Sequence, residues 1–263
     1  MKKYFFGKYY KFVNNHGFSF AVIISESNDG PELQVITPDG AHVINDKSAV
    51  KVNNQEISFN IKQDDISLTG LITLGSLNPL KKRVMGPFSI LPLECKHEVY
   101  SMFHTLNGNI TYNQKTYSFN DGVGYIEGDR GVNFPKKYIW YNSVKNNQSV
   151  TLAIATIPIA FIKFIGILCF IKTNKDEYYL CTYNCAKRVK ITPNEIIIKK
   201  GKYRFTIKVL SDGGHLLKAP TQGRMSRYIK ENIKVKTSYT LKKGEEVLIE
   251  TTDEYSSLEY MFD

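Results

Sequence analysis

The feature that most constrains this chain is a series of turn signals that recur along its whole length, often about ten residues apart. Glycine beside asparagine or aspartate favours a tight turn, because glycine accepts positive φ angles and aspartate caps the turn. The clearest signals are Asn28-Asp29-Gly30-Pro31, Pro38-Asp39-Gly40, Asn53-Asn54, Asn107-Gly108, Asn120-Asp121-Gly122, Lys200-Gly201, Asp212-Gly213-Gly214 and Lys243-Gly244. Convincing helical periodicity is absent between them, so the sequence predicts an all-β sandwich or barrel.

Short β-branched and aromatic segments between the turn signals are the predicted strands. They include residues 4–12, 18–24, 33–37, 195–199, 203–210, 233–241, 246–252 and 257–262. The chain holds enough apolar side chains for a core, since 42% of its 263 residues are hydrophobic, and this excludes a disordered protein. The length suits one large or two small domains.

One apolar stretch, residues 150–171, is about as long as a membrane-spanning helix. Pro158, Lys163 and Gly166 interrupt it, however, and Ile, Val, Thr and Phe dominate its composition. These residue types favour strands. We therefore interpret the stretch as two buried strands, residues 150–157 and 162–171, joined at Pro158.

The formal net charge is +10, but the lysines are scattered and often alternate with apolar residues, as in Ile229-Lys230 and Lys234-Val235-Lys236. Such alternation indicates solvated strand faces. A nucleic-acid surface would need a basic stripe with exposed aromatic residues, and the chain has neither a helix-turn-helix pattern nor a zinc-finger spacing. The sequence therefore predicts no nucleic-acid partner.

The four cysteines, Cys95, Cys169, Cys181 and Cys185, show no redox or zinc-binding spacing, because three residues separate the last two. We expect them to be reduced and mostly buried. Residues 1–6 are basic and then aromatic, and no apolar signal-peptide core follows them. We therefore expect a cytoplasmic protein.

The stretch 124–142, near the midpoint, combines the only tryptophan of the chain with two carboxylates, three glycines and a proline. If residues 125–129 form a strand, Tyr125, Glu127 and Asp129 share one face. Residues 131–135 then end that strand, because glycine permits unusual dihedral angles and proline donates no ladder hydrogen bond. In the extended run that follows, Tyr138 and Trp140 share a face, so acidic and aromatic groups meet at this junction.

This stretch resembles the signature of the tocopherol cyclase-like family, which reads roughly Tyr-x-Glu-x-x-x-Gly-x-x-Phe-Pro-x-x-aromatic-x-Trp. The matching positions are Tyr125, Glu127, Gly131, Phe134, Pro135, Tyr138 and Trp140. Plant members commonly carry tryptophan where this chain has Arg130, and tend to carry asparagine where it has Asp129. The segment Leu217-Lys218-Ala219-Pro220-Thr221 also resembles a Leu-Arg-Ala-Pro-Thr stretch of plant members.

The resemblance implies two consecutive lipocalin-like antiparallel β-barrels or half-barrels. We place the N-terminal domain at residues 1–130 and the C-terminal domain at residues 131–263. Small barrels enclose a single apolar ligand, so this fold goes together with a lipophilic small molecule as the partner. Peripheral contact with a membrane and the oligomeric state are left open.

For chemistry, the resemblance implies protonation of a prenyl double bond, after which an oxygen traps the tertiary cation. This needs a carboxylic acid kept protonated near neutral pH, an apolar pocket and aromatic faces. Glu127 is the expected acid and Asp129 the neighbour that raises its pKa. The expected ligand-facing residues are Tyr125, Tyr138, Trp140, Phe134 and Arg130.

Two alternatives stay open at the level of sequence. Glu127 and Asp129 can instead pair with Arg130, Lys136 or Lys137, or cap the turn at Gly131, in which case their role is structural. The whole protein can likewise be a non-catalytic binding or carrier protein that uses the same pocket.

A second cluster resembles the family segment Glu-Cys-x-His…Ser-Met-x-His, with matches at Glu94, Cys95, His97, Ser101, Met102 and His104. The histidines are candidate proton shuttles or, with Glu94, metal ligands. A regular strand places His97 and His104 on opposite faces, so the sequence predicts no metal site and no cofactor. We expect His104 to be catalytic, and His97 and Glu94 to contact the ligand.

Overall fold

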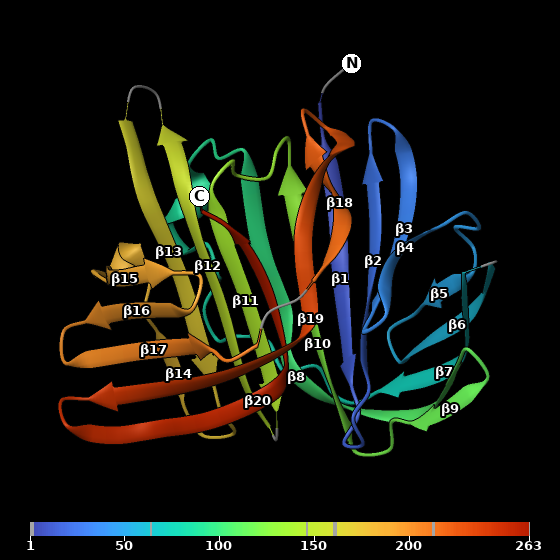
Figure 1. The fold of residues 1–263 in the computed structure, drawn as a ribbon. Coiled ribbons are helices and arrows are strands. Elements are labelled where there is room, and N and C mark those ends of the chain that lie inside the picture. The colour runs from blue at the N-terminus through green and yellow to red at the C-terminus, as the bar shows by residue number, and fades with distance from the viewer. Residues whose placement is uncertain (1–2, 64, 146, 160–161, 212–213, 263) are drawn as a thin grey trace.

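The protein folds into two antiparallel β-sheets of ten strands each, which lie side by side (Figure 1). The structure is a computed structural model, and it describes residues 3–262 apart from 64, 146, 160–161 and 212–213. The only helical elements within the described residues are two short 3₁₀ helices, η1 (Gly86–Ile90) and η2 (Thr182–Asn184). The prediction of an all-β protein is confirmed.

The first sheet is built from the N-terminal half of the chain. Its strands are β1 (Phe5–Val13), β2 (Ser19–Ser27), β3 (Gly30–Thr37), β4 (Gly40–Ile44), β5 (Val50–Val52), β6 (Glu56–Gln63), β7 (Ile66–Leu74), β8 (Cys95–Tyr112), β9 (Lys115–Ser118) and β10 (Gly122–Gly131). They pair in the order β4-β3-β2-β1-β10-β8-β7-β6-β5, and β9 pairs with β8.

The second sheet is built from the C-terminal half. Its strands are β11 (Tyr138–Lys145), β12 (Gln148–Ile159), β13 (Ile162–Lys172), β14 (Glu177–Tyr179), β15 (Lys187–Thr192), β16 (Glu195–Lys200), β17 (Tyr203–Val209), β18 (His215–Thr221), β19 (Arg224–Lys243) and β20 (Glu246–Met261). The order is β14-β13-β12-β11-β20-β19-β17-β16-β15, with β18 on β19. This repeats the first sheet, with β11 in the place of β1 and β20 in the place of β10, as expected for two consecutive half-barrels.

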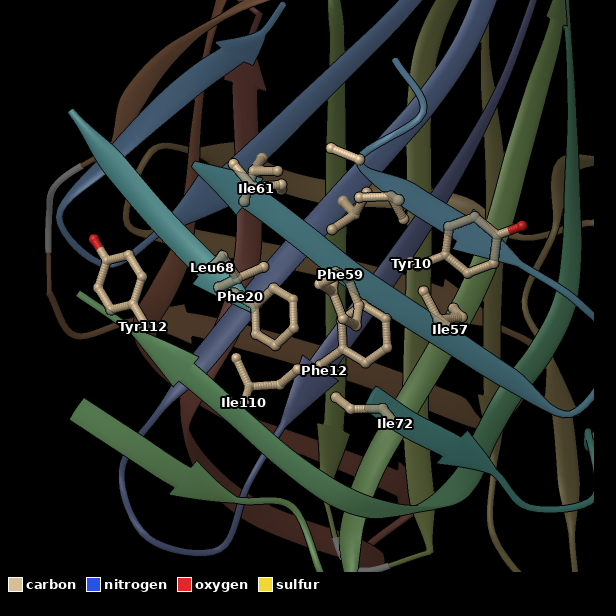
Figure 2. Close-up of a cluster of buried hydrophobic side chains, with 14 of the residues drawn as sticks. Tyr10, Phe12, Phe20, Ile57, Phe59, Ile61, Leu68, Ile72, Ile110 and Tyr112 are labelled. Atoms are coloured by element: carbon tan, nitrogen blue, oxygen red, sulfur yellow. The ribbon is translucent and has the colours of Figure 1, made fainter. Parts of the chain in front are cut away.

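Each sheet curls around a core of its own. Inside the first sheet, aromatic rings pack against one another, with Phe12 stacked on Phe20 and Phe59 edge-on to both (Figure 2). Inside the second sheet, a separate apolar cluster includes Tyr141 and Phe205. Because large side chains fill the curl of the first sheet, its inside differs from the ligand-filled small barrel that the sequence suggests.

A third apolar cluster joins the two sheets. It combines side chains such as Tyr9, Tyr125 and Met102 from the first sheet with Trp140 and Ile229 from the second. Two polar contacts add to this interface: the Gln34 side chain donates to the carbonyl of Lys218 and accepts from its amide, so β3 and β18 are joined directly. The faces that carry the candidate site therefore lie between the sheets.

The apolar stretch at residues 150–171 forms strands β12 and β13, as predicted, although Pro158 does not join them. It lies within β12 opposite Lys163, beyond the point where β12 pairs with β11. A missing amide proton is tolerated there because β12 has a neighbour on one side only. No helix among the described residues is both long and apolar enough to cross a membrane.

Two further details differ from the predicted strands. The predicted strands 246–252 and 257–262 form one continuous strand, β20, which ends at Met261, because the polar segment between them stays paired. Its Asp253 is buried and accepts a hydrogen bond from the Ser143 hydroxyl at 2.6 Å. The predicted turn at Asp212-Gly213-Gly214 lies partly outside the described residues.

Candidate active site

A cavity of about 580 Å³ lies between the two sheets. It is bordered by β1, β2, β8 and β10 of the first sheet and by β11, β12, β13, β18, β19 and β20 of the second, together with the loops before β8 and between β10 and β11. Its apolar wall includes Phe5, Ile23, Met85, Phe134, Leu168, Leu217 and Ile229. This volume and this lining are typical of sites for small organic molecules.

Glu127, on β10, is the carboxyl group that both sheets hold in place. It borders the cavity and is only 4% exposed. The Tyr125 hydroxyl and the Trp140 indole Nε1 both donate hydrogen bonds to its Oε2, the latter at 3.0 Å. No hydrogen bond to Oε1 is present among the described residues, which leaves that oxygen to a bound ligand.

Burial raises the pKa of Glu127 to about 7, because the ionised form is poorly solvated between the sheets. The Asp129 carboxylate adds to the rise, whereas His97 and the hydrogen bonds from Tyr125 and Trp140 oppose it. A substantial fraction of Glu127 is therefore protonated at neutral pH, as a general acid requires.

His97, on β8, lies between the two carboxyl groups of β10. Its Nδ1 is 3.1 Å from Asp129 Oδ1, and its Nε2 is 3.3 Å from Glu127 Oε2 without hydrogen-bond geometry. Burial lowers the pKa of His97, but the Glu127 and Asp129 carboxylates outweigh this effect and bring it to about 9. His97 is therefore a cation at neutral pH.

The same three side chains, His97, Glu127 and Asp129, form a group that could hold a metal ion, since their ligand atoms lie within 4.8 Å of one another. The sequence predicts no metal, and that prediction stays untested. Glu127 Oε2 already accepts two hydrogen bonds, and a protonated histidine has no lone pair for a metal. A proton therefore competes directly with any metal ion for this group.

The ion pairs that the structural alternative requires of Glu127 and Asp129 are not among these contacts. Among the described residues, neither carboxylate forms an ion pair with Arg130, Lys136 or Lys137. Asp129 instead accepts a hydrogen bond from the Cys95 thiol at 3.4 Å in addition to its contact with His97.

A second carboxyl cluster borders the same cavity from the C-terminal sheet. Glu231 on β19 and Glu259 on β20 are cross-strand partners, and are 1% and 7% exposed. The Tyr9 hydroxyl donates to Glu231 Oε1 at 2.9 Å, and the Tyr138 hydroxyl donates to Glu259 Oε2. Burial raises the pKa of Glu231 to about 7, and burial together with the Glu231 charge raises the pKa of Glu259 well above its usual value.

The sequence analysis missed this second cluster, although β19 carries a signal for it. Exposed lysines alternate there with buried apolar residues, and Glu231 falls in the buried register, between Ile229 and Ile233. A carboxylate on the apolar face of an alternating strand is rare without a function or a partner. That register identifies Glu231 as a candidate.

His104, the predicted catalytic histidine, is buried but is not among the residues that border the cavity. On the neighbouring strand β10, His104 pairs with Gly124 and His97 pairs with Asp129. Gly124 and Asp129 are an odd number of residues apart, so the two histidines face opposite sides of the sheet. Burial lowers the pKa of His104 to about 4, and its Nδ1 lies 3.0 Å from the Ser101 hydroxyl.

The remaining predicted ligand-facing residues divide into two groups. Tyr138, Trp140, Phe134, His97 and the exposed Glu94 border the cavity. Tyr125 lies behind Glu127, where its hydroxyl oxygen also lies 2.9 Å from the Thr151 hydroxyl, which can donate to it. Arg130 is exposed and does not border the cavity, because strand alternation turns it to the face opposite Glu127 and Asp129.

Comparison with known families agrees with these residues. The model of a family described as tocopherol cyclase-like matches residues 40–260, most of the chain and both sheets. The chain belongs to the tocopherol cyclase-like family. No curated protein sequence matches it.

Solved structures that resemble this tocopherol cyclase-like protein share its fold at low sequence identity. Kievitone hydratase from Nectria haematococca is 9% identical with a TM-score of 0.58, over 98% of this chain and 89% of its own. CghA with Sch210972 is 6% identical with a TM-score of 0.61, over 98% and 88%. CghA alone is 6% identical with a TM-score of 0.62, over 100% and 89%.

Proposed function

We propose that this protein binds a lipophilic, prenyl-bearing small molecule between its sheets and protonates one of its double bonds, leading to cyclisation or hydration. The observation that carries the proposal is Glu127, a buried carboxyl group with a raised pKa and one free oxygen at an apolar cavity. In this position a substantial fraction of the carboxylic acid is neutral near pH 7 and can still give up its proton.

In the proposed reaction, the O–H bond of Glu127 breaks as its proton forms a C–H bond with the alkene, and the electron pair of the double bond forms that bond. The more substituted carbon becomes a cation. A hydroxyl oxygen then forms a C–O bond with this carbon and loses its proton. The oxygen belongs to the substrate itself in cyclisation, and to water in hydration.

The surroundings of Glu127 suit a carbocation. The Trp140 ring packs edge-to-face against Tyr9 with ring centroids 5.2 Å apart, and both residues border the cavity together with Tyr138. Aromatic faces attract cations, and the ionised Glu127 left after proton transfer adds a nearby negative charge. The apolar walls keep bulk water away from the cation.

The comparisons support this proposal at the level of reaction class. The family description names a cyclase, and one protein of similar fold is named a hydratase. Both acid-catalysed cyclisation and hydration of an alkene begin with its protonation. The same first step at Glu127 therefore serves either outcome.

The experiment is incubation of the purified protein and its Glu127→Gln variant with a panel of prenylated hydroquinones and isoprenoids, followed by chromatography with mass detection. Cyclisation leaves the mass unchanged but shifts retention, and hydration adds one water. We expect Glu127→Gln to lose at least a hundredfold in turnover, in the range of a lost general acid. Asp121→Asn, an exposed acid just before β10, is the matched control and retains turnover.

Other outcomes separate the alternatives. Binding without turnover in either protein points to a carrier that uses the same cavity. Equal turnover by the wild type and Glu127→Gln removes Glu127 as the acid. Absence of both binding and turnover across the panel contradicts the lipophilic ligand.

A further inference from the structure

The second carboxyl cluster, formed by Glu231 and Glu259, has no role in the protonation step. Both side chains border the cavity from the C-terminal sheet, whereas Glu127 borders it from the N-terminal sheet. Two ring side chains connect these walls: Tyr9 donates to Glu231, and its ring packs on Trp140, which donates to Glu127. A ligand in this cavity therefore meets a carboxyl group of each cluster.

Glu231 has one buried carboxylate oxygen that lacks a donor when Glu259 is ionised. Its Oε1 accepts from Tyr9, while its Oε2 is buried with no hydrogen-bond partner. An unpaired buried carboxylate oxygen costs free energy, so such atoms normally have a donor. The neighbouring Glu259 cannot donate a hydrogen bond to this oxygen when both carboxyl groups are ionised, and two like charges this close repel each other.

We infer that Glu231 and Glu259 share one proton and act as the base of the reaction, holding the attacking hydroxyl group and accepting its proton. This inference rests on the function proposed above. In the balanced step, the hydroxyl oxygen forms the C–O bond to the cation, its O–H bond breaks, and the proton joins the carboxylate pair. The pair then releases a proton to solvent, and Glu127 takes one up, so that both return to their starting states.

This assignment gives the substrate an orientation. The double bond lies toward Glu127 and the hydroxyl group toward Glu231, with the Tyr9 and Trp140 rings between the two ends. A carboxylate discriminates a hydroxyl group from an ether because only the hydroxyl donates a hydrogen bond. A ligand pair in which only one member has this donor tests the assignment through binding.

The experiment measures binding of a geranylated hydroquinone and of its dimethyl ether through the fluorescence of Trp140, the single tryptophan, which borders the cavity. We expect the wild type to bind the hydroquinone about tenfold more tightly than the ether, as for a hydrogen bond to a charged acceptor. Glu231→Gln and Glu259→Gln reduce this ratio to below threefold, and either one suffices if the other does not fold. Glu127→Gln retains the ratio.

The control is Glu250→Gln, an exposed carboxylate on the same strand as Glu259, which keeps the wild-type ratio. An unchanged ratio in both folded pair variants overturns the inference, as does equal binding of the two ligands by the wild type. Both results leave the lipophilic site and Glu127 intact. Failure of the wild type to bind either ligand overturns the proposed function together with the inference.

Discussion

Glu127 is subject to two nearby charges of opposite sign. The His97 cation favours its ionised form, and the Asp129 carboxylate favours its neutral form. The two neighbours also contact each other, with His97 Nδ1 3.1 Å from Asp129 Oδ1. The proton affinity of Glu127 is therefore set by this pair as well as by burial.

Neutral replacements of His97 and Asp129 should move the pKa of Glu127 in opposite directions. His97→Gln raises it, because the favourable cation is lost, and Asp129→Asn lowers it, because the repelling carboxylate is lost. The measurement is a ¹³C NMR titration of the side-chain carboxyl carbon, assigned by its disappearance in Glu127→Gln. Shifts in the same direction in both variants contradict the arrangement, and Asp121→Asn serves as the unshifted control.

At the scale of elements, strands β7 and β8 approach each other closely at a glycine. Gly108 in β8 lies opposite Ile72 of β7 and has φ of 132°, a region open mainly to glycine. A Cβ there would collide with the backbone oxygen of Leu71. The neighbouring backbone cannot yield as a flexible side chain would.

We therefore expect Gly108→Ala to lower the free energy of unfolding by about 3 kcal/mol, the sum of a steric clash and backbone strain. The control is Gly201→Ala, where φ is 54° but no atom lies near the added Cβ, so that only strain of about 1 kcal/mol remains. Urea denaturation measures both. Equal losses contradict a specific role for close approach in β8.

The sequence predicted strands well because their signals are local. Glycine and asparagine mark turns, and β-branched runs mark buried strands such as residues 150–157. The prediction that Pro158 joins the two strands was wrong. A proline can lie within a strand that has a partner on one side only, and the sequence does not show how many partners a strand has. The prediction that Arg130 faces the ligand was avoidable from the sequence. Strand alternation, which puts Glu127 and Asp129 on one face, puts Arg130 on the other.

The candidate site was predicted only in two short segments of the chain, residues 94–97 and 125–140. Tyr125, Glu127, Asp129, Tyr138 and Trp140 fall within one short stretch, and the fold brings them together. Glu231 and Glu259 enter the cavity from β19 and β20, and only the packing of one sheet on the other brings them to the same cavity as Glu127. No local sequence pattern predicts that these residues lie close together, although the register of β19 marks Glu231 as unusual.

For the whole molecule, three carboxyl groups with raised pKa values lie between the two sheets. A pKa raised by folding means that the folded state binds protons more tightly than the unfolded chain. For Glu231 this stabilisation is complete below the unfolded pKa of 4.5 and is lost as the pH rises through about 7. His97 acts in the same direction at higher pH, from 6.5 to about 9.

Raising the pH from 5 to 8 should therefore lower the free energy of unfolding, because burial between the sheets disfavours the ionised forms of Glu127, Glu231 and Glu259, which also repel one another. The rise from 4.5 to about 7 for Glu231 corresponds to roughly 3 kcal/mol. In urea denaturation across this range, Glu231→Gln should lose about 2 to 3 kcal/mol less than the wild type, while Glu250→Gln follows the wild type. Parallel pH profiles for wild type and Glu231→Gln would mean that the interface does not hold this proton. The upper limit of pH 8 matters, since burial lowers the pKa of Lys11 to about 8 and its neutral form restores stability beyond it.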